Sequence, residues 1–193
     1  MIILGIDPGS ITTGYAFLKE VESGLLALEY GVLHAPPTNA LEDRLLHILT
    51  KLEELLDRYH PDALSMEGVF FQKNVHIALV LGHIRGSILG ACRKRGMTYN
   101  EYSPRLVKQT VTGDGSASKE QVASMIFSIL GIKCDDLPLD ASDALAIAWT
   151  HANPSPIKKA LSNSGSPLNL ASRKRKVTKK QWADLIEKMG GTI

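Results

Sequence analysis

The 193-residue chain has only two cysteines, Cys92 and Cys134. They lie in unrelated sequence contexts, and neither has a second cysteine or a histidine at the spacing of a metal-binding motif. This excludes a disulfide-stapled scaffold and a cysteine-based zinc site. Both thiols are expected to be reduced.

Long apolar runs are also missing. No stretch of about 18 uncharged apolar residues is present, so we expect no membrane-spanning helix. The chain opens directly on a predicted strand, without a basic leader, and a cytoplasmic location is therefore expected. With 44% hydrophobic residues, the chain can bury one substantial core, followed at most by a short appendage.

The formal net charge is only +2, but the charges are unevenly distributed. Residues 85–119 carry seven Lys or Arg against two Asp or Glu, and residues 156–193 carry nine against two. The rest of the chain is acidic. Basic segments beside acidic ones suit an enzyme that holds nucleic-acid phosphates next to carboxylates and a cation, although solvated charged faces explain the composition equally well.

The first chemical feature is a carboxylate at the end of the first predicted strand. A branched apolar run at residues 2–6 predicts a strand buried on both faces, and Asp7 follows it directly. Pro8 and Gly9 end the strand, which places Asp7 at an edge of the sheet where ligands of α/β proteins bind. An isolated Asp-Pro-Gly more often caps a turn, so a functional role for Asp7 needs support from other segments.

The remaining pattern predicts an α/β fold with a five-stranded mixed sheet flanked by helices. Residues 13–19 and 26–34 complete a three-strand antiparallel meander with the first strand. A leucine-striped helix ending near residue 59 leads to a parallel strand at 63–67, and residues 99–102 form a fifth strand. Further helices are expected at 74–95, from 103 to before Gly113, at 118–130 and in the 140s.

Two regions of this pattern leave their role open. The helix at 74–95 has a small residue at every fourth position, which permits close packing either on the sheet or on a second copy of the chain; these residues are Ala78, Gly82, Gly86 and Gly90. Residues 156–193 are predicted to form a basic, linker-like tail with a short amphipathic helix, outside a domain at 1–155.

Carboxylates recur in three segments that are far apart in the sequence. Glu67 ends the predicted parallel strand next to Asp7, and Asp140 and Asp143 share a face at the start of an apolar helix. Acids at a helix start also serve as caps. Four converging carboxylates repel one another unless a cation neutralises them, so they predict a Mg²⁺ site, with two ions supporting phosphodiester hydrolysis. Lys108 and Lys119 would supply positive charge near the scissile phosphate.

Several motifs between Met1 and about Pro154 occur together in one known family. They are Gly5-Ile6-Asp7-Pro8-Gly9-Ser10, Glu67-Gly68-Val69-Phe70, Lys73-Asn74, Val107-Lys108-Gln109-Thr110-Val111, Gly115-Ser116-Ala117, Lys119 and Asp140-Ala141-Ser142-Asp143-Ala144-Leu145-Ala146. With them the chain resembles the RuvC family of Holliday junction resolvases, which belongs to the ribonuclease H-like superfamily.

The resemblance implies a ribonuclease H-like fold and a homodimer that cuts two opposed strands of a four-way DNA junction during recombination and repair. It implies two Mg²⁺ ions per site, replaceable by Mn²⁺, held by the four acids, with Lys119 assisting catalysis. It also implies that DNA is contacted by Phe70, Lys73, Lys108 and Lys119, and that a RuvA–RuvB branch-migration complex is a partner.

Two features depart from the family pattern, and two other functions compete with it. Phe71 follows Phe70, so either ring could enter the junction, and the tail beyond about residue 170 is longer than the family core requires. The opening motif also occurs in actin-like ATPases and sugar kinases, but these need two such domains. A non-catalytic junction-binding protein needs the basic segment but not four converging acids.

Overall fold

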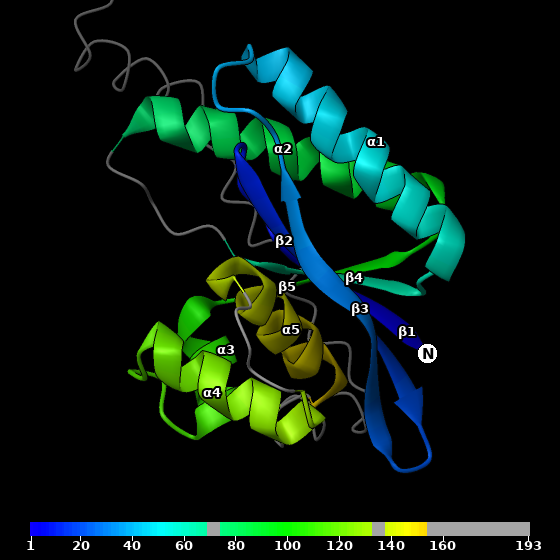
Figure 1. The fold of residues 1–193 in the computed structure, drawn as a ribbon, viewed down its shortest axis with the longest axis vertical. Coiled ribbons are helices and arrows are strands. Elements are labelled where there is room, and N and C mark those ends of the chain that lie inside the picture. The colour runs from blue at the N-terminus through cyan, green and yellow to red at the C-terminus, as the bar shows by residue number, and fades with distance from the viewer. Residues whose placement is uncertain (69–73, 133–137, 154–193) are drawn as a thin grey trace, which may run out of the picture. The chain divides into compact units, whose positions relative to one another are not determined.

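A computed structural model of the chain describes residues 1–68, 74–132 and 138–153. They form a five-stranded sheet with five helices around it (Figure 1). The strands are β1 (Ile2–Asp7), β2 (Thr12–Val21), β3 (Gly24–His34), β4 (Ala63–Glu67) and β5 (Thr98–Tyr102). The helices are α1 (Leu41–Tyr59), α2 (Val75–Lys94), α3 (Pro104–Thr112), α4 (Lys119–Leu130) and α5 (Leu139–Ala152).

The sheet has the predicted mixed topology, with strand order β3-β2-β1-β4-β5. β1, β2 and β3 pair as an antiparallel meander, whereas β4 runs parallel to both β1 and β5. Ile6 pairs with Met66 in the parallel ladder, one residue before each strand ends. The carboxyl ends of β1 and β4 therefore lie side by side.

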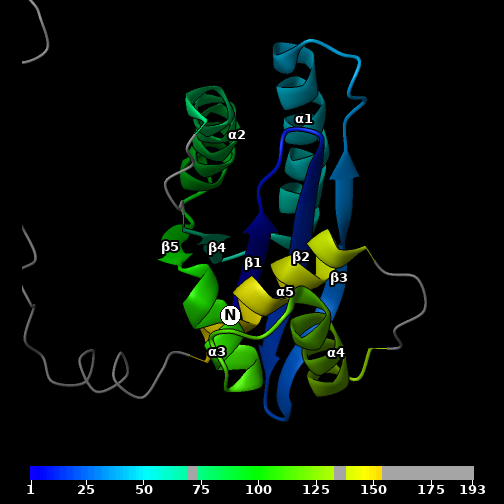
Figure 2. The ribbon, with the colours of Figure 1, turned by 90° about the vertical axis from the view of Figure 1, so that its left-hand side faces the viewer.

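Helices cover both faces of this sheet. Figures 1 and 2 show α1 and α2 on one face, and α3, α4 and α5 on the other. The core on the first face includes Phe17, Ile48, Leu52, Leu56, Ile84 and Ile88. The core on the second includes Leu18, Val107, Ile126, Phe127 and Leu145. β1 supplies both cores, because Leu4 and Ile6 point to the first and Ile3 to the second, as the alternation of a buried central strand requires.

Side-chain caps and a glycine define the helix ends of α3 and α4. The Ser103 hydroxyl accepts a hydrogen bond from the Leu106 amide at the start of α3. Ser118 and Gln121 form a reciprocal capping box at the start of α4, and Gly131 ends that helix in the left-handed conformation. In α5 the N-cap residue is Pro138, and Asp140 lies in the first turn without a capping bond. Asp140 is therefore not the N-cap, although an acid in the first turn is still favoured by the helix dipole.

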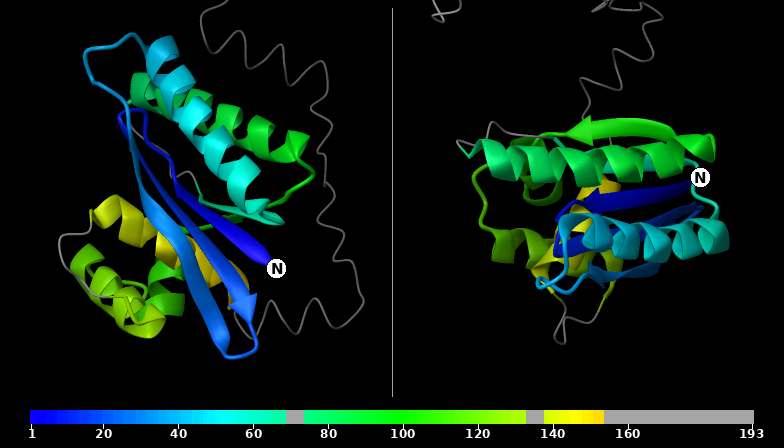
Figure 3. Two further views of the ribbon diagram at one scale, coloured as in Figure 1. Left: turned by 45° about the vertical axis from the view of Figure 1, so that its right-hand side comes forward. Right: turned by 90° about the horizontal axis from the view of Figure 1, so that it is seen from above.

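α2 leaves much of its apolar surface uncovered. It lies next to α1 (Figure 3) and buries Ile84 and Ile88, but Val75, Ile77 and Leu79 near its start are exposed. The small-residue positions do not pack on the sheet, because a methyl group added at Gly82, Gly86 or Gly90 would meet no atom within 4 Å. Among the described helices, α2 alone is long and apolar enough to cross a membrane by length and composition.

Candidate active site

The end of β1 meets the start of α5 through two glycines. Asp7 on β1 pairs with Gly14 on β2. A Cβ atom added to Gly14 would lie 2.0 Å from the Asp140 carbonyl oxygen, and one added to Gly5 would lie 2.2 Å from the Ala144 carbonyl oxygen. These positions therefore have to lack a side chain for the α5 backbone to rest directly on the sheet. This close packing brings the first turn of α5 to Asp7.

Three of the four predicted acids form a compact cluster. Asp7, Asp140 and Asp143 are half-buried, and one carboxylate oxygen from each lies within 4.8 Å of the others. Asp140 and Asp143 are three residues apart on α5, so they project from the same side of the helix. Hard divalent cations prefer such sets of carboxylate oxygens. The cluster is the arrangement expected of a metal site.

The electrostatics of the cluster also fit a cation. The pKa of Asp7 is raised from 3.8 to about 7, mainly by burial and then by the charges of Asp143, Glu67 and Asp140, while Lys119 opposes them. Near neutral pH this carboxyl therefore holds a proton for much of the time unless positive charge is added. A divalent cation would replace that proton and relieve the repulsion among the acids.

Glu67 stands beside this cluster rather than within it. Its position follows from the parallel pairing of β4 with β1, which places it next to Asp7 at the sheet edge. Burial is the largest cause that raises its pKa, followed by the charge of Asp143, whereas Lys119, Arg85 and Lys108 lower it. Of the four acids that the sequence predicts to converge, the structure thus groups three carboxylates closely and places the fourth, Glu67, beside them.

Lys119 makes a contact that the sequence did not indicate. It is the first residue of α4, and its Nζ donates to Asp143 Oδ2 at 2.6 Å. This hydrogen bond is the main cause that raises the pKa of Lys119. Its ammonium therefore already neutralises one member of the acidic cluster, and the side chain remains 58% exposed.

A pocket of about 240 Å³ opens beside the acids. Acidic and basic side chains share its wall with apolar ones, and the lining residues are Glu67, Pro104, Val107, Lys108, Lys119, Val122, Asp143 and Ile147. Lys108 Nζ donates to the Ala117 carbonyl at 2.6 Å, which ties α3 to the turn that precedes α4. Two ammonium groups next to carboxylates suit a phosphate that contacts both the lysines and a cation held by the carboxylates.

Several predicted residues fall outside the described residues. Phe70, Phe71 and Lys73 lie in segment 69–73, and Cys134 lies in segment 133–137. The predicted tail, residues 156–193, is likewise not described, so its boundary and its role stay predictions. Cys92 is buried.

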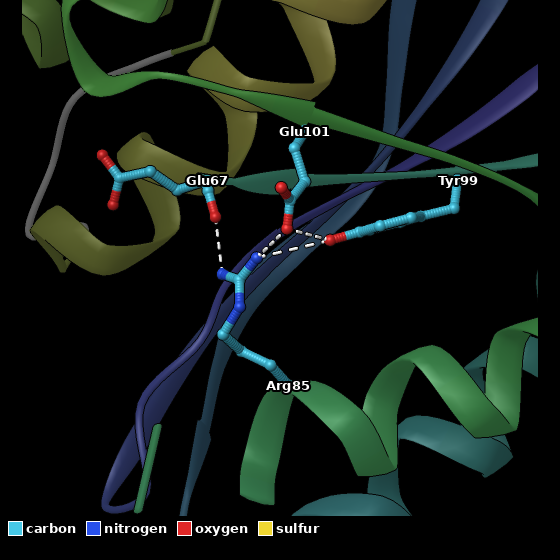
Figure 4. A network of polar contacts seen from close by, with 4 residues as sticks. All are labelled: Glu67, Arg85, Tyr99 and Glu101. Carbon is cyan, nitrogen blue, oxygen red and sulfur yellow. Dashed lines mark hydrogen bonds and ion pairs between the residues drawn. The ribbon is translucent and has the colours of Figure 1, made fainter. Parts of the chain in front are cut away.

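Two residues that matter for the site, Gly14 and Arg85, were not predicted from the sequence. Gly14 carried a weak signal, because a glycine inside a strand often marks a close backbone approach. Arg85 carried none: it lies on α2, and its guanidinium donates to the main-chain carbonyl of Glu67 at 2.5 Å (Figure 4). A charged residue in an otherwise apolar helix does not reveal which carbonyl it contacts.

Known proteins are similar to this chain in sequence and in fold. A family model described as "Crossover junction endodeoxyribonuclease RuvC" matches residues 3–151. The protein of that name from Chlorobaculum parvum is 42% identical over 149 residues, which span 77% of this chain and 80% of the relative. The one from Ruminiclostridium cellulolyticum is 42% identical over 153 residues, which span 79% of this chain and 92% of the relative.

A solved structure agrees with these sequence matches. Thermus thermophilus RuvC in complex with a Holliday junction substrate superposes with a TM-score of 0.75 at 33% identity, over 82% of this chain and 96% of that one. The predicted ribonuclease H-like fold and the family resemblance are confirmed. The chain belongs to the RuvC family of crossover junction endodeoxyribonucleases.

Proposed function

We propose that this chain resolves four-way DNA junctions by divalent-metal-dependent hydrolysis of a phosphodiester in each of two opposed strands, in recombination and repair. The observation that carries the proposal is the convergence of Asp7, Asp140 and Asp143 within 4.8 Å, with Glu67 beside them, in a chain of this nuclease family. A protein that only bound junctions would have no use for a half-buried cluster of mutually repelling acids.

The four acids are the proposed ligands of two Mg²⁺ ions, for which Mn²⁺ can substitute. When bound, such ions lower the pKa of a water molecule and neutralise charge on the leaving oxygen. Asp7 would hold the cation as the deprotonated carboxylate, and Asp140 and Asp143 would complete the set from α5. Lys119 is proposed to turn from Asp143 to the scissile phosphate, and Lys108 holds the turn before α4 so that Lys119 stays in reach.

DNA contacts are proposed for Lys108 and Lys119 and also for Phe70 and Lys73, which lie outside the described residues. Lys108 and Lys119 line the pocket beside Glu67 and Asp143, where a phosphate would lie. Phe70 and Lys73, in the segment between β4 and α2, are proposed to contact bases and phosphates near the junction centre. A phosphate contact fixes the position of the DNA, whereas an inserted ring unstacks bases.

A homodimer is proposed because two opposed strands must be cut, and α2 is the surface that best suits it. Val75, Ile77 and Leu79 are exposed there, and the open glycine positions permit close approach of a second helix. The same uncovered surface accounts for the membrane-like composition of α2. In the cell, we place the dimer in the cytoplasm with a RuvA–RuvB branch-migration complex as its partner.

The decisive experiment is cleavage of a synthetic four-way junction with and without Mg²⁺. We expect paired, symmetrical cuts with Mg²⁺, none in EDTA, and unchanged junction binding in both. The variants Asp7→Asn, Glu67→Gln, Asp140→Asn and Asp143→Asn should each bind the junction but fail to cut it. Cleavage in EDTA would contradict the metal role, and turnover of ATP without DNA would favour the actin-like ATPase function instead.

A further inference from the structure

Arg85 connects α2 to the carboxyl end of β4. Its side chain is only 12% exposed, although it carries a charge. Nη1 donates to the Glu67 carbonyl oxygen at 2.5 Å, and Nη2 contacts Glu101 Oε1 at 2.5 Å and the Tyr99 hydroxyl at 3.3 Å (Figure 4). The Tyr99 hydroxyl donates to the same carboxylate of Glu101. A largely buried guanidinium is thus fixed from two sides.

The contact reaches the main chain of Glu67 and leaves its carboxylate free. In Figure 4 the Glu67 carboxylate points away from Arg85. Glu67 is the last residue of β4, and the Gly68 amide donates to the Tyr102 carbonyl at 2.8 Å. The peptide group between Glu67 and Gly68 is therefore held on both sides, by β5 through its amide and by α2 through its carbonyl. This peptide group sets the direction in which the Glu67 side chain leaves the strand.

We propose that Arg85 is a positioning residue that directs the Glu67 carboxylate toward the cluster of three aspartates, while Glu101 and Tyr99 orient the Arg85 guanidinium. The inference rests on the proposed function, because it takes Glu67 as a metal ligand. A charge-assisted hydrogen bond to a carbonyl is short and directional, so it restricts the rotation of that peptide group more than packing does. Glu67 needs this support because it ends its strand and lies beside the cluster of three aspartates rather than in it.

Arg95 provides a matched control on the same helix. It is the C-cap residue of α2, with its side chain 26% exposed, and it pairs with Glu53 and Asp57 of α1. Like Arg85, it joins α2 to a neighbouring element through charged contacts, but these lie at the C-terminal end of the helix, whereas Arg85 lies near its middle. A loss of general stability should therefore be similar in Arg85→Met and Arg95→Met, whereas a change at the metal site should be specific to Arg85→Met.

The test measures Mn²⁺ binding to the full-length protein without DNA, by electron paramagnetic resonance of the free ion. Groups that hold metal ligands in place typically contribute about tenfold to 100-fold in affinity. We expect Arg85→Met to raise the half-saturating Mn²⁺ concentration about tenfold, Arg85→Lys to raise it less, and Arg95→Met to leave it within about twofold of the wild type. The Mg²⁺ concentration for half-maximal single-turnover cleavage should shift in parallel, with junction affinity unchanged.

Each outcome decides the question. Equal half-saturation in Arg85→Met, Arg95→Met and the wild type overturns the positioning role. If Arg85→Met does not fold, Glu101→Gln replaces it, because that change loosens the guanidinium without removing it; a shift of about twofold or more supports the inference and no shift overturns it. A wild-type protein that neither binds Mn²⁺ nor needs a divalent cation for cleavage would refute the proposed metal site itself.

Discussion

At the scale of single residues, the site gathers several carboxylates, and the Lys119 ammonium offsets part of their charge. Asp7 has a strongly raised pKa, because burial and three neighbouring acids act on it together. Lys119 relieves Asp143 directly. Removing the charge of Asp7 should therefore change the stability of the metal-free protein, and removing that of Lys119 should change its metal affinity, apart from their effects on cleavage.

Asp7→Asn should stabilise the metal-free protein. The pKa of Asp7 is about 7 in the folded state, against 3.8 as the ordinary value, so the native state binds more protons than the unfolded state between these pH values. The free energy of unfolding of the wild type then falls as pH rises through this window. At pH 8 in EDTA we expect Asp7→Asn to be about 2 kcal/mol more stable, since each pKa unit is about 1.4 kcal/mol and solvent screens part of the shift.

Chemical denaturation of both proteins at pH 5 and pH 8 checks this prediction. The advantage of Asp7→Asn should be smaller at pH 5, and Mg²⁺ should reverse it at pH 8 by stabilising only the wild type. Equal stability at pH 8 in EDTA would show that the carboxylate is solvated well enough to stay charged.

Lys119→Met should slow cleavage of the bound junction by about 100-fold while it leaves junction affinity within a few-fold of the wild type. A positive group aimed at the phosphate acts mainly in the transition state, where charge develops. Single-turnover rates at saturating protein separate the two effects. In the absence of DNA, the same variant should bind Mn²⁺ at least as tightly as the wild type, because Asp143 loses its competing partner.

At the scale of secondary-structure elements, two features matter for function. The first is the close packing of α5 on the sheet, and the second is the exposed apolar surface of α2. The first depends on Gly5 and Gly14, where a Cβ would collide with main-chain atoms of α5. The second depends on a helix whose open small-residue positions and exposed apolar side chains lie away from its buried side.

Gly14→Ala should abolish cleavage and destabilise the fold by about 1–3 kcal/mol, the usual cost of overpacking. The added carbon would lie 2.0 Å from the Asp140 carbonyl oxygen, so the start of α5 must move away from Asp7. Gly31→Ala on β3 is the control, because its nearest new neighbour is the Tyr15 hydroxyl at 3.2 Å, which is a side-chain atom. An active Gly14→Ala enzyme would show that α5 can shift without opening the cluster of aspartates.

Leu79→Glu should convert the proposed dimer to a monomer, because it places a charge on the exposed apolar surface of α2. Leu46→Glu on α1 is the matched control: both leucines are exposed, at 59% and 67%. Sedimentation equilibrium should report a monomer for the first variant and a dimer for the second. Junction cleavage by Leu79→Glu should then lose the pairing of its two cuts. A dimeric Leu79→Glu protein would move the interface elsewhere.

The sequence predicted the elements of the fold well, but it predicted the site only in part. Strand ends and helix caps are local, so Asp7, Glu67 and the capping box at Ser118 could be inferred from spacing and turn chemistry. The role of Gly14 depends on which helix crosses it, and that of Arg85 depends on which carbonyl it reaches. The pairing of Lys119 with Asp143 likewise joins two helices whose packing no local pattern specifies.

At the scale of the whole molecule, the basic residues beyond 155 should act as an electrostatic contact with DNA arms. Residues 156–193 carry nine cations against two anions. If roughly three of these cations meet phosphates, a variant that ends at Ser155 should show a salt dependence of junction binding weaker by about 2.7 logarithmic units per decade of salt, at about 0.9 per contact. Cleavage at saturating protein should hardly change.

Binding titrations over a range of salt concentrations, with thermal melts of both proteins, test the tail. An unchanged salt dependence combined with a lowered melting temperature would mean that the amphipathic helix predicted around Trp182 and Leu185 docks on protein instead.

The packing of α5 on Gly5 and Gly14 also has a consequence for the newly made protein. Asp7 and Glu67 leave the ribosome early, whereas Asp140 and Asp143 are translated only with the last described helix. Chains fold as they emerge, from the N-terminus onward. A nascent or prematurely terminated chain that lacks α5 also lacks Asp140 and Asp143 and so has no complete set of acids for a cation, and unfinished copies should be harmless to DNA. The order of translation thus delays nuclease activity until the domain is complete.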